Sequence, residues 1–392
     1  MGVWRAVLLW CFLPQFASAQ SQDLPVPNAV KPFIDAFGKP LHPVLNGVAP
    51  GGGIGVGLGY DTSRDKDWFH NGTALVTWNR YWSLDGETGY QTHKLRIGIF
   101  GEMRNMSRLD FFGFGRRSSL ADHTNFRLRE NFAGAKGWFR PGAAVRLGGR
   151  VELYKPQLGA GSSQDVPQIE ARFSAASVPG LNATPLFERY RGFAEFTYPV
   201  RADLNQPGSG YHGYQGTYQL AVEEVRDHDA GLFNFHRIEG EVQQRFHGFR
   251  AGQRFTVHGL MAAANPGSIV PFYLQYTLGG GGGLNAFRPD TIGTDGTRDT
   301  LRAYQNYRFR DRDILLVQAE YRVPIRGPID GTIFYDVGQV APNVAGLIDH
   351  VKQGSGFSLS YMRGGATIGR FDVGYGSGEG LQLFWTFGLL HP

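Results

Sequence analysis

Short segments in which apolar residues alternate with polar or small ones recur along most of this 392-residue chain. Near the C-terminus, for example, Leu381, Leu383 and Trp385 alternate with Gly380 and Gln382. Successive side chains of a strand point to opposite faces, so this period of two predicts strands with one apolar face. We find no helical periodicity and no change of texture after about residue 50. The sequence therefore predicts an all-β fold.

The first nineteen residues have the features of a secretory leader. Arg5 supplies a positive charge, an apolar core follows it, and Ala-Ser-Ala at 17–19 forms a cleavage site. The apolar core is too short to span a bilayer, so residues 1–19 are predicted to be a signal peptide that is removed. The only cysteine, Cys11, lies inside it. No disulfide and no thiolate metal site are therefore expected.

Export, 56 glycines, 14% aromatic residues and regular alternation together indicate a transmembrane β-barrel. Lipid cannot hydrogen-bond a backbone, so only helices and closed sheets cross a bilayer. We expect the bacterial outer membrane as the location, with its lipids and lipopolysaccharide as partners. The 39 basic and 34 acidic residues are interspersed, which gives no indication of nucleic acid binding. A soluble β-sandwich would also alternate, but it would not expose so many aromatic and aliphatic faces.

Sixteen strands can be counted, and bacterial single-chain barrels have an even number. The expected strands are 52–60, 73–82, 91–102, 108–116, 124–138, 142–154, 187–199, 212–225, 232–247, 252–263, 270–279, 313–325, 329–340, 354–364, 366–376 and 379–390. Residues 20–50 are expected to form a short Pro-rich periplasmic tether, and residues 51–392 the barrel domain.

Charged side chains on the last strands indicate which face lines the lumen. A charge at membrane depth is costly against lipid, so such side chains should point inward. The charges expected to converge on the lumen are those of Glu320, Arg322, Asp336, Arg370 and Asp372. Between 279 and 313 lies a loop rich in Gly, Arg and Asp, far longer than a hairpin needs. We expect this loop to fold back into the lumen.

These segments resemble the BamA/TamA superfamily of outer-membrane assembly and translocation barrels, also called bacterial surface antigens. In that family, a Leu/Val-Arg-Gly-Phe/Tyr motif on a lumen loop follows the eleventh strand and contacts an acidic residue of a Phe-x-Asp-x-Gly wall motif. The resemblance covers residues 45–390. It assigns the loop motif to Leu284, Asn285, Ala286 and Phe287, flanked by Gly283 and Arg288, and the wall motif to Phe334, Asp336 and Gly338.

Two departures from the family pattern affect what the resemblance implies. Asn285 stands where the family has arginine, so the family salt bridge cannot form there. Arg288, Arg302 or Arg308 could instead supply a cation to Asp336, in a contact stronger than a surface ion pair. In addition, about thirty residues separate the cleavage site from the first expected strand. Since that is too few for a domain, a short member without periplasmic repeat domains is expected.

The first expected strand alternates glycine with apolar residues, and the last one begins glycine-rich. Glycines give no inward packing and weaken a strand, so the junction of the two strands is expected to be the weakest part of the barrel. The resemblance implies that this seam opens sideways and pairs with a client strand. The alternative is that glycine permits sharp curvature. The residues assigned to the seam are Gly53, Gly55, Gly57, Gly59, Gly378 and Gly380.

The function expected from the resemblance is insertion, assembly or translocation of other proteins at the outer membrane, with unfolded client proteins as partners. The alternatives are a passive or gated channel, and a structural surface barrel without assembly activity. No enzyme activity, catalytic residue, cofactor or metal site is predicted, because the eleven histidines show no ligand spacing. Asp227-His228-Asp229 is the one candidate for rim chemistry, and a polar turn is the commoner explanation.

Overall fold

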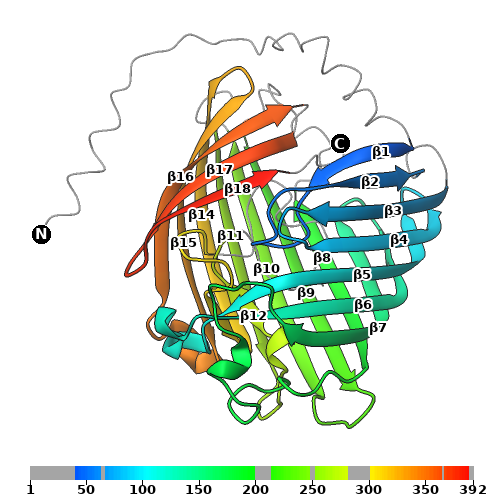
Figure 1. Ribbon diagram of the computed structural model, residues 1–392. Coiled ribbons are helices and arrows are strands. Elements are labelled where there is room, and N and C mark those ends of the chain that lie inside the picture. The colour runs from blue at the N-terminus through cyan, green and yellow to red at the C-terminus, as the bar shows by residue number, and fades with distance from the viewer. Residues whose placement is uncertain are drawn as a thin grey trace, which may run out of the picture.

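The computed structural model describes residues 40–62, 67–198, 213–247, 252–280, 301–363 and 366–387. Sixteen strands form one antiparallel sheet that curls into a cylinder (Figure 1). The strands are β1 (Leu41–Asn46), β2 (Gly55–Asp61), β3 (Trp68–Thr77), β4 (Trp82–Gln91), β5 (Leu95–Phe111), β6 (Thr124–Phe139), β7 (Val145–Ala160), β8 (Phe187–Tyr198), β9 (Gly213–Asp227), β10 (Phe235–His247), β11 (Arg254–Ala264), β14 (Asp313–Arg326), β15 (Ile329–Ala341), β16 (Lys352–Arg363), β17 (Ala366–Gly376) and β18 (Gly380–Phe387). The prediction of a sixteen-stranded β-barrel is therefore confirmed.

Wall strands follow one another in chain order, and their connections differ between the two ends of the cylinder. Residues 92–94 and 327–328 make tight turns at one end, which we call the short-turn end. The opposite end carries longer loops with 3₁₀ turns, and we call it the long-loop end. In bacterial barrels the long loops face the cell exterior. Four of the 3₁₀ turns at this end are η2 (Gly115–Arg117), η3 (Leu120–Asp122), η4 (Ile169–Ala171) and η6 (Val344–Ile348).

The two faces of the wall differ as the alternation predicts. On β18, Leu381, Leu383 and Trp385 are 56–66% exposed on the outer face. On the inner face, Arg370 and Asp372 of β17 are each only 2% exposed. Such a wall suits a barrel with lipid outside and polar groups within. Among the described residues, no helix has the length and apolar character needed to cross a membrane.

The strand count is correct, but it results from errors that cancel. The first strand, β1, lies in the segment predicted to be a tether, and the expected strand 52–60 is the second strand of the sheet. β4 was missed, while β5 was predicted as two strands because a bulge between Met106 and Leu109 breaks its alternation. Segment 270–279 is not a wall strand; it is apolar because it is buried inside the molecule.

Glycines of β2 allow its neighbouring strands to approach closely. A Cβ at Gly59 would lie 2.6 Å from Nε2 of His42 on β1, and one at Gly57 would lie 2.0 Å from the carbonyl oxygen of Ala74 on β3.

Because β2 pairs with both β1 and β3, it is not an edge of the sheet order. The assignment of the seam to this strand was therefore wrong. The sheet order begins at β1 and ends at β18, so these two strands are the edges of the sheet.

Buried apolar side chains gather under the long loops. Phe111 and Phe126, from the ends of β5 and β6, pack edge-on against Phe272, with ring centroids 5.7 and 5.0 Å away. Phe272 belongs to a further 3₁₀ turn, η5 (Phe272–Leu274), at the start of the long segment between β11 and β14. This packing fixes the base of a chain segment that then enters the lumen.

Candidate functional site

The segment between β11 and β14 forms a hairpin inside the barrel. Its strands β12 (Tyr276–Leu278) and β13 (Phe309–Asp311) pair with each other and belong to no wall sheet. Both strands contact β15, and β12 also contacts β14. We call residues 276–280 and 301–311 the lumen hairpin. The expectation that this loop folds into the lumen agrees with these contacts.

Arg302 joins the lumen hairpin to the barrel wall. Its Nε donates to Oδ2 of Asp336 at 2.8 Å, and its Nη2 donates to Oδ1 at 2.5 Å. Its backbone N–H also donates to Asp336 Oδ2, at 3.1 Å. The guanidinium lies 4.0 Å from the ring centroid of Phe334. This bidentate geometry, with an aromatic ring against the cation, is the strongest form of arginine–carboxylate contact.

Three more ion pairs extend this contact along the wall. Arg302 also donates to Glu320 on β14, and Arg370 on β17 donates to the same Glu320 oxygen at 3.1 Å. Nε of Arg370 donates to Asp372 at 2.7 Å. All five side chains of this network, those of Arg302, Glu320, Asp336, Arg370 and Asp372, are at most 4% exposed.

Buried charges are tolerated only when each has partners, because desolvating an ion costs several kcal/mol. Here three carboxylates face two guanidinium groups. Ser358 adds a hydroxyl that donates to Asp372 at 2.5 Å and accepts from Arg370 at 2.8 Å. Removing Arg302 would leave Asp336 buried without a cation, and removing Arg370 would do the same to Asp372. The buried charge of Asp336 is paired only when the hairpin occupies this position, so the network disfavours other positions of the hairpin.

Glycines of the wall make room for the backbone of the hairpin. A Cβ at Gly354 would lie 2.3 Å from Cβ of Ala303, and one at Gly374 would lie 2.6 Å from the carbonyl oxygen of Arg302. A Cβ at Gly338 would lie 3.0 Å from Leu278. The hairpin thus lies directly on β15, β16 and β17, where any larger wall residue would displace it.

The opposite side of the hairpin binds a different part of the wall. Tyr276 donates to Oε2 of Glu239 on β10 at 2.9 Å, and Arg237 on β10 donates to the carbonyl oxygen of Leu274 at 2.9 Å. The Arg237 guanidinium lies 4.7 Å from the Tyr276 ring centroid. The hairpin therefore spans the lumen from β10 to β17.

Some of the residues predicted for the site lie together in the structure, and others do not. The structure brings Glu320, Phe334, Asp336, Gly338, Arg370 and Asp372 together around the hairpin. Arg322 is also buried, and its Nη1 lies 3.9 Å from the sulfur of Met362. Residues 283–288, which include the predicted loop motif and Arg288, lie outside the described residues. Arg308 turns elsewhere, to Glu379 at 2.5 Å and Ser118 at 2.7 Å. Of the two described arginines among the candidates, Arg302 and Arg308, Arg302 is the one that binds Asp336.

The sequence contained a better match to the family loop motif. Leu301-Arg302-Ala303-Tyr304 fits Leu/Val-Arg-Gly-Phe/Tyr with alanine in place of glycine, and it keeps the arginine. Its tyrosine donates to the carbonyl oxygen of Gln353 at 2.8 Å. The signal that could have identified it was the arginine itself, since only a cation can pair with the wall aspartate. The assignment to residues 284–287 followed the glycine run instead, and that segment lies outside the described residues.

Glycines predicted for the far side of the seam are turn residues. Gly378 and Gly380 have φ of +87° and +76°, and nothing lies within 4 Å of a Cβ built on either. Gly53, with φ of +78°, lies before β2 begins. These positions need glycine because other residues rarely adopt a positive φ. Their presence is explained by turn geometry, without reference to a weak seam.

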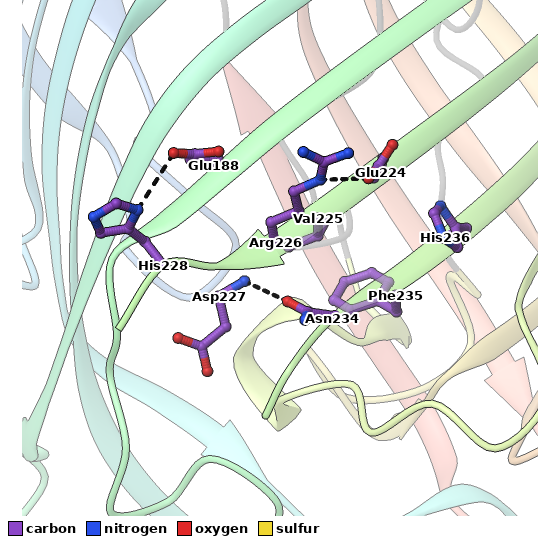
Figure 2. Close-up of a pocket in the computed structure, with 9 residues that line it drawn as sticks. All are labelled: Glu188, Glu224, Val225, Arg226, Asp227, His228, Asn234, Phe235 and His236. Carbon is purple, nitrogen blue, oxygen red and sulfur yellow. Dashed lines mark hydrogen bonds and ion pairs between the residues drawn. The ribbon is translucent and has the colours of Figure 1, made fainter. Parts of the chain in front are cut away.

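A shallow pocket of about 450 Å³ lies on the rim at β8, β9 and β10 (Figure 2). The Asp227 carboxylate there accepts hydrogen bonds from the backbone N–H groups of Asp229, Ala230 and Leu232, at 3.0–3.1 Å. This carboxylate organises the turn after β9. His228 lies 3.4 Å from Glu188 and is 61% exposed. An arrangement of this kind fits a structural polar turn. In the described part of the chain, no cluster of three or more His, Cys, Asp or Glu residues could hold a metal ion.

Asp311, at the base of the hairpin, predicts a pH dependence of stability. Burial raises its pKa to about 6, although the backbone N–H of Arg312 donates to it at 2.8 Å. Because the folded state binds this proton more tightly than the unfolded chain, stability should increase as pH falls from about 6 to 4, by up to about 3 kcal/mol. Unfolding titrations at pH 4 and pH 7 should show a larger gain for the natural protein than for Asp311→Asn. An equal gain in both proteins would contradict the assignment.

Comparison with known proteins shows a shared fold. No family model and no curated protein matches this sequence. BamA from Haemophilus ducreyi, in a structure lacking POTRA domains 1–3, is similar with a TM-score of 0.54 and 12% identity, over 88% of this chain and 68% of that one. CdiB from Escherichia coli is similar with a TM-score of 0.58 and 9% identity, over 88% of this chain and 62% of that one. CdiB from Acinetobacter baumannii is similar with a TM-score of 0.50 and 11% identity, over 89% of this chain and 58% of that one.

These identities are low, so the similarity concerns the fold alone. The chain spans less than two thirds of the length of either CdiB structure. Its fold is nevertheless that of BamA and CdiB over 88–89% of its own length. Together with the apolar outer wall and the charged lumen, this similarity identifies the chain as a bacterial outer-membrane β-barrel.

Proposed function

We propose that this barrel promotes the insertion or translocation of other polypeptides at the outer membrane. The observation that carries the proposal is the contact of Arg302 with Asp336, which fixes a lumen hairpin against β15, β16 and β17. The last of these strands, β17, pairs with β18, which ends the sheet order. The same loop-to-wall contact is what the family resemblance implies. Its partners would be unfolded client proteins and the surrounding lipids.

The proposed action takes place between β1 and β18, the two edge strands of the sheet. β1 has only six residues and contains a proline, so it is the shortest wall strand and cannot donate from every position. In the described sheet, β1 pairs with β2 and β18 pairs with β17, so backbone groups on the outer side of each edge strand need partners that lipid does not offer. An incoming client strand supplies them by pairing with the free edge. The hairpin would keep the rest of the wall in place while the junction opens. This action needs no catalytic group.

Covalent closure of the junction tests the proposal. Cysteine pairs joining Pro43 or Leu45 of β1 to Leu381 or Leu383 of β18 would hold the strands together, and the natural chain offers only Cys11 as a competing thiol. Bacteria carrying the oxidised variant should lose the client proteins that they also lose when the barrel is depleted. Addition of a reductant should restore them. Outer-membrane protein levels measured by quantitative proteomics provide the readout.

A matched control joins two strands that stay paired. Leu45 and Val56 are register partners on β1 and β2, so a cysteine pair there adds a crosslink without closing the junction. Client levels should be unaffected by this control. If the junction-closing variant also leaves every client at its normal level, lateral opening is excluded as the mode of action.

A gated channel is the second candidate, because the hairpin does not fill the whole interior. A space of about 260 Å³ remains beside β1, β4 and β5, lined by Asp85, Glu102 and Arg104 among others. Such a polar space could pass small solutes if the hairpin moved. Conductance measurements distinguish the two candidates.

A further inference from the structure

Three arginines stand together on the outer face of the wall, near its long-loop end. Arg127 and Arg129 occupy alternate positions of β6, and the residues between and beside them, Leu128 and Glu130, are buried in the interior. Arg108 is exposed in the β5 bulge, opposite Arg127. Outward alternation therefore places the guanidinium groups on the face that also carries the apolar belt.

The height of these arginines on the wall matches the edge of a bilayer. Arg129 and the half-exposed Phe139 stand ten positions apart on the outward side of β6. At about 3.3 Å per residue and a tilt of about 40°, the two lie roughly 25 Å apart along the membrane normal, which is the height of a barrel's apolar belt. If Phe139 marks the inner boundary, Arg129 lies at the outer one, among lipid headgroups.

The surrounding wall holds two of these side chains in place. The Arg127 guanidinium lies across Gly159 of β7, where an added Cβ would be 2.6 Å from its Nη2. The guanidinium carbon of Arg129 is 5.6 Å from the ring centroid of Trp82 on β4. Stacking on glycine and on an aromatic ring orients an arginine without neutralising its charge. The wall therefore holds the guanidinium groups of Arg127 and Arg129 in defined positions.

Neutralising partners are found beside this group but not within it. In the next sector of the rim, Arg226 binds Glu224 at 2.5 Å and Lys155 lies 3.5 Å from Asp229. Asp110, which follows Arg108 by two positions, binds Nε2 of His123 at 2.8 Å. Within the described ranges, no carboxylate lies within 4.0 Å of the guanidinium groups of Arg108, Arg127 or Arg129, so three positive charges remain available at headgroup height.

We propose that Arg108, Arg127 and Arg129 bind the phosphate groups of a phosphorylated lipid in the outer leaflet. Guanidinium groups bind phosphate through paired, charge-assisted hydrogen bonds, and a phosphorylated lipid presents that group where these side chains lie. The acyl chains of the same lipid would cover the apolar residues below, such as Leu153 of β7, which is 49% exposed. This site is independent of the lumen hairpin and of the proposed action at the β1–β18 junction.

Native mass spectrometry of the full-length barrel in detergent tests this proposal. The probes are lipid A carrying two phosphates and the same lipid after enzymatic dephosphorylation. The natural protein should retain the phosphorylated form preferentially. The variant R108Q/R127Q/R129Q should bind it roughly tenfold or more weakly, since three charge-assisted contacts are lost. Folding of each variant is checked by its heat-modifiable migration on gels, and the three single variants replace the triple one if it fails to fold.

Arg140→Gln is the matched control. Its guanidinium carbon lies 4.6 Å from the ring centroid of Trp138, at the short-turn end of the same strand, so it removes a similar arginine from the opposite interface. Binding of the phosphorylated lipid should be unchanged in this variant. Equal binding of both lipid forms, or an unchanged affinity in folded variants of the three arginines, would overturn the proposal. Complete competition by millimolar inorganic phosphate would also overturn it, because the site would then recognise a free anion.

Discussion

Replacing Arg302 with methionine is expected to lower the free energy of unfolding of the barrel by about 3–5 kcal/mol. The substitution leaves Asp336 buried without a cation, while Glu320 keeps its ion pair with Arg370. Methionine has a similar length, so lost volume contributes little to the effect. Denaturant titration of the reconstituted protein, followed by tryptophan fluorescence, measures the change. The hairpin should also become accessible to proteases before the wall unfolds.

Arg310→Met provides the matched comparison, because Arg310 is another fully buried arginine of the same hairpin. It donates to the carbonyl oxygen of Phe272 at 2.8 Å, and burial lowers its pKa to about 9. Among the described residues, no carboxylate lies within salt-bridge distance of it. Removing this unpaired cation should therefore change stability by less than about 1 kcal/mol, or raise it. Equal losses in the two variants would show that the carboxylates do not determine the effect.

Excision of the hairpin tip is expected to convert a closed barrel into an open pore. Leu278 and Phe309 are register partners, so an Asn-Gly turn can replace residues 279–308 and still join β12 to β13. The deletion removes Arg302, Ala303 and Tyr304, which bind the wall. Sixteen strands enclose a lumen wide enough for water, so planar-bilayer recordings should show large, steady currents that the natural protein lacks.

The control for this experiment is R302M, which keeps the full hairpin but loses its ion pairs. It should show intermittent rather than steady openings, because the other contacts of the hairpin, such as that of Tyr276 with Glu239, remain. If the natural protein and the deletion variant conduct equally, the hairpin does not obstruct the lumen. The channel function would then be favoured over the assembly function.

Much of the fold could be predicted because the bilayer imposes a simple rule on each strand. Alternation identified most wall strands, including β14 and β15, whose outer residues face lipid and whose inner residues carry charge. β1 escaped prediction because a six-residue strand with Pro43 resembles a linker. Segment 270–279 was misassigned because an apolar segment buried in the interior has the same composition as one facing lipid. Sequence alone does not distinguish these two surroundings.

The candidate site was predictable on the wall but not in the loop. Asp336, Arg370 and Glu320 lie on strands, where period and cost of burial fix the direction of each side chain. Arg302 lies in a loop without periodicity, so only its motif could identify it, and Ala303 in place of glycine obscured that motif. The structure explains why alanine is accepted there, since glycines of β16 and β17 provide the space that the loop residue lacks.

The position of the lumen hairpin against the wall is the central claim, and a single crosslink tests it most directly. Phe309→Cys and Lys352→Cys place two thiols where the hairpin meets β16, since Nζ of Lys352 lies 5.5 Å from the ring centroid of Phe309, with Val317→Cys and Val337→Cys as a pair known to be opposite in the wall. In native membranes treated with a short bismaleimide crosslinker, both pairs should be joined and change migration on gels. If the wall pair crosslinks and the hairpin pair does not, the hairpin does not occupy this position.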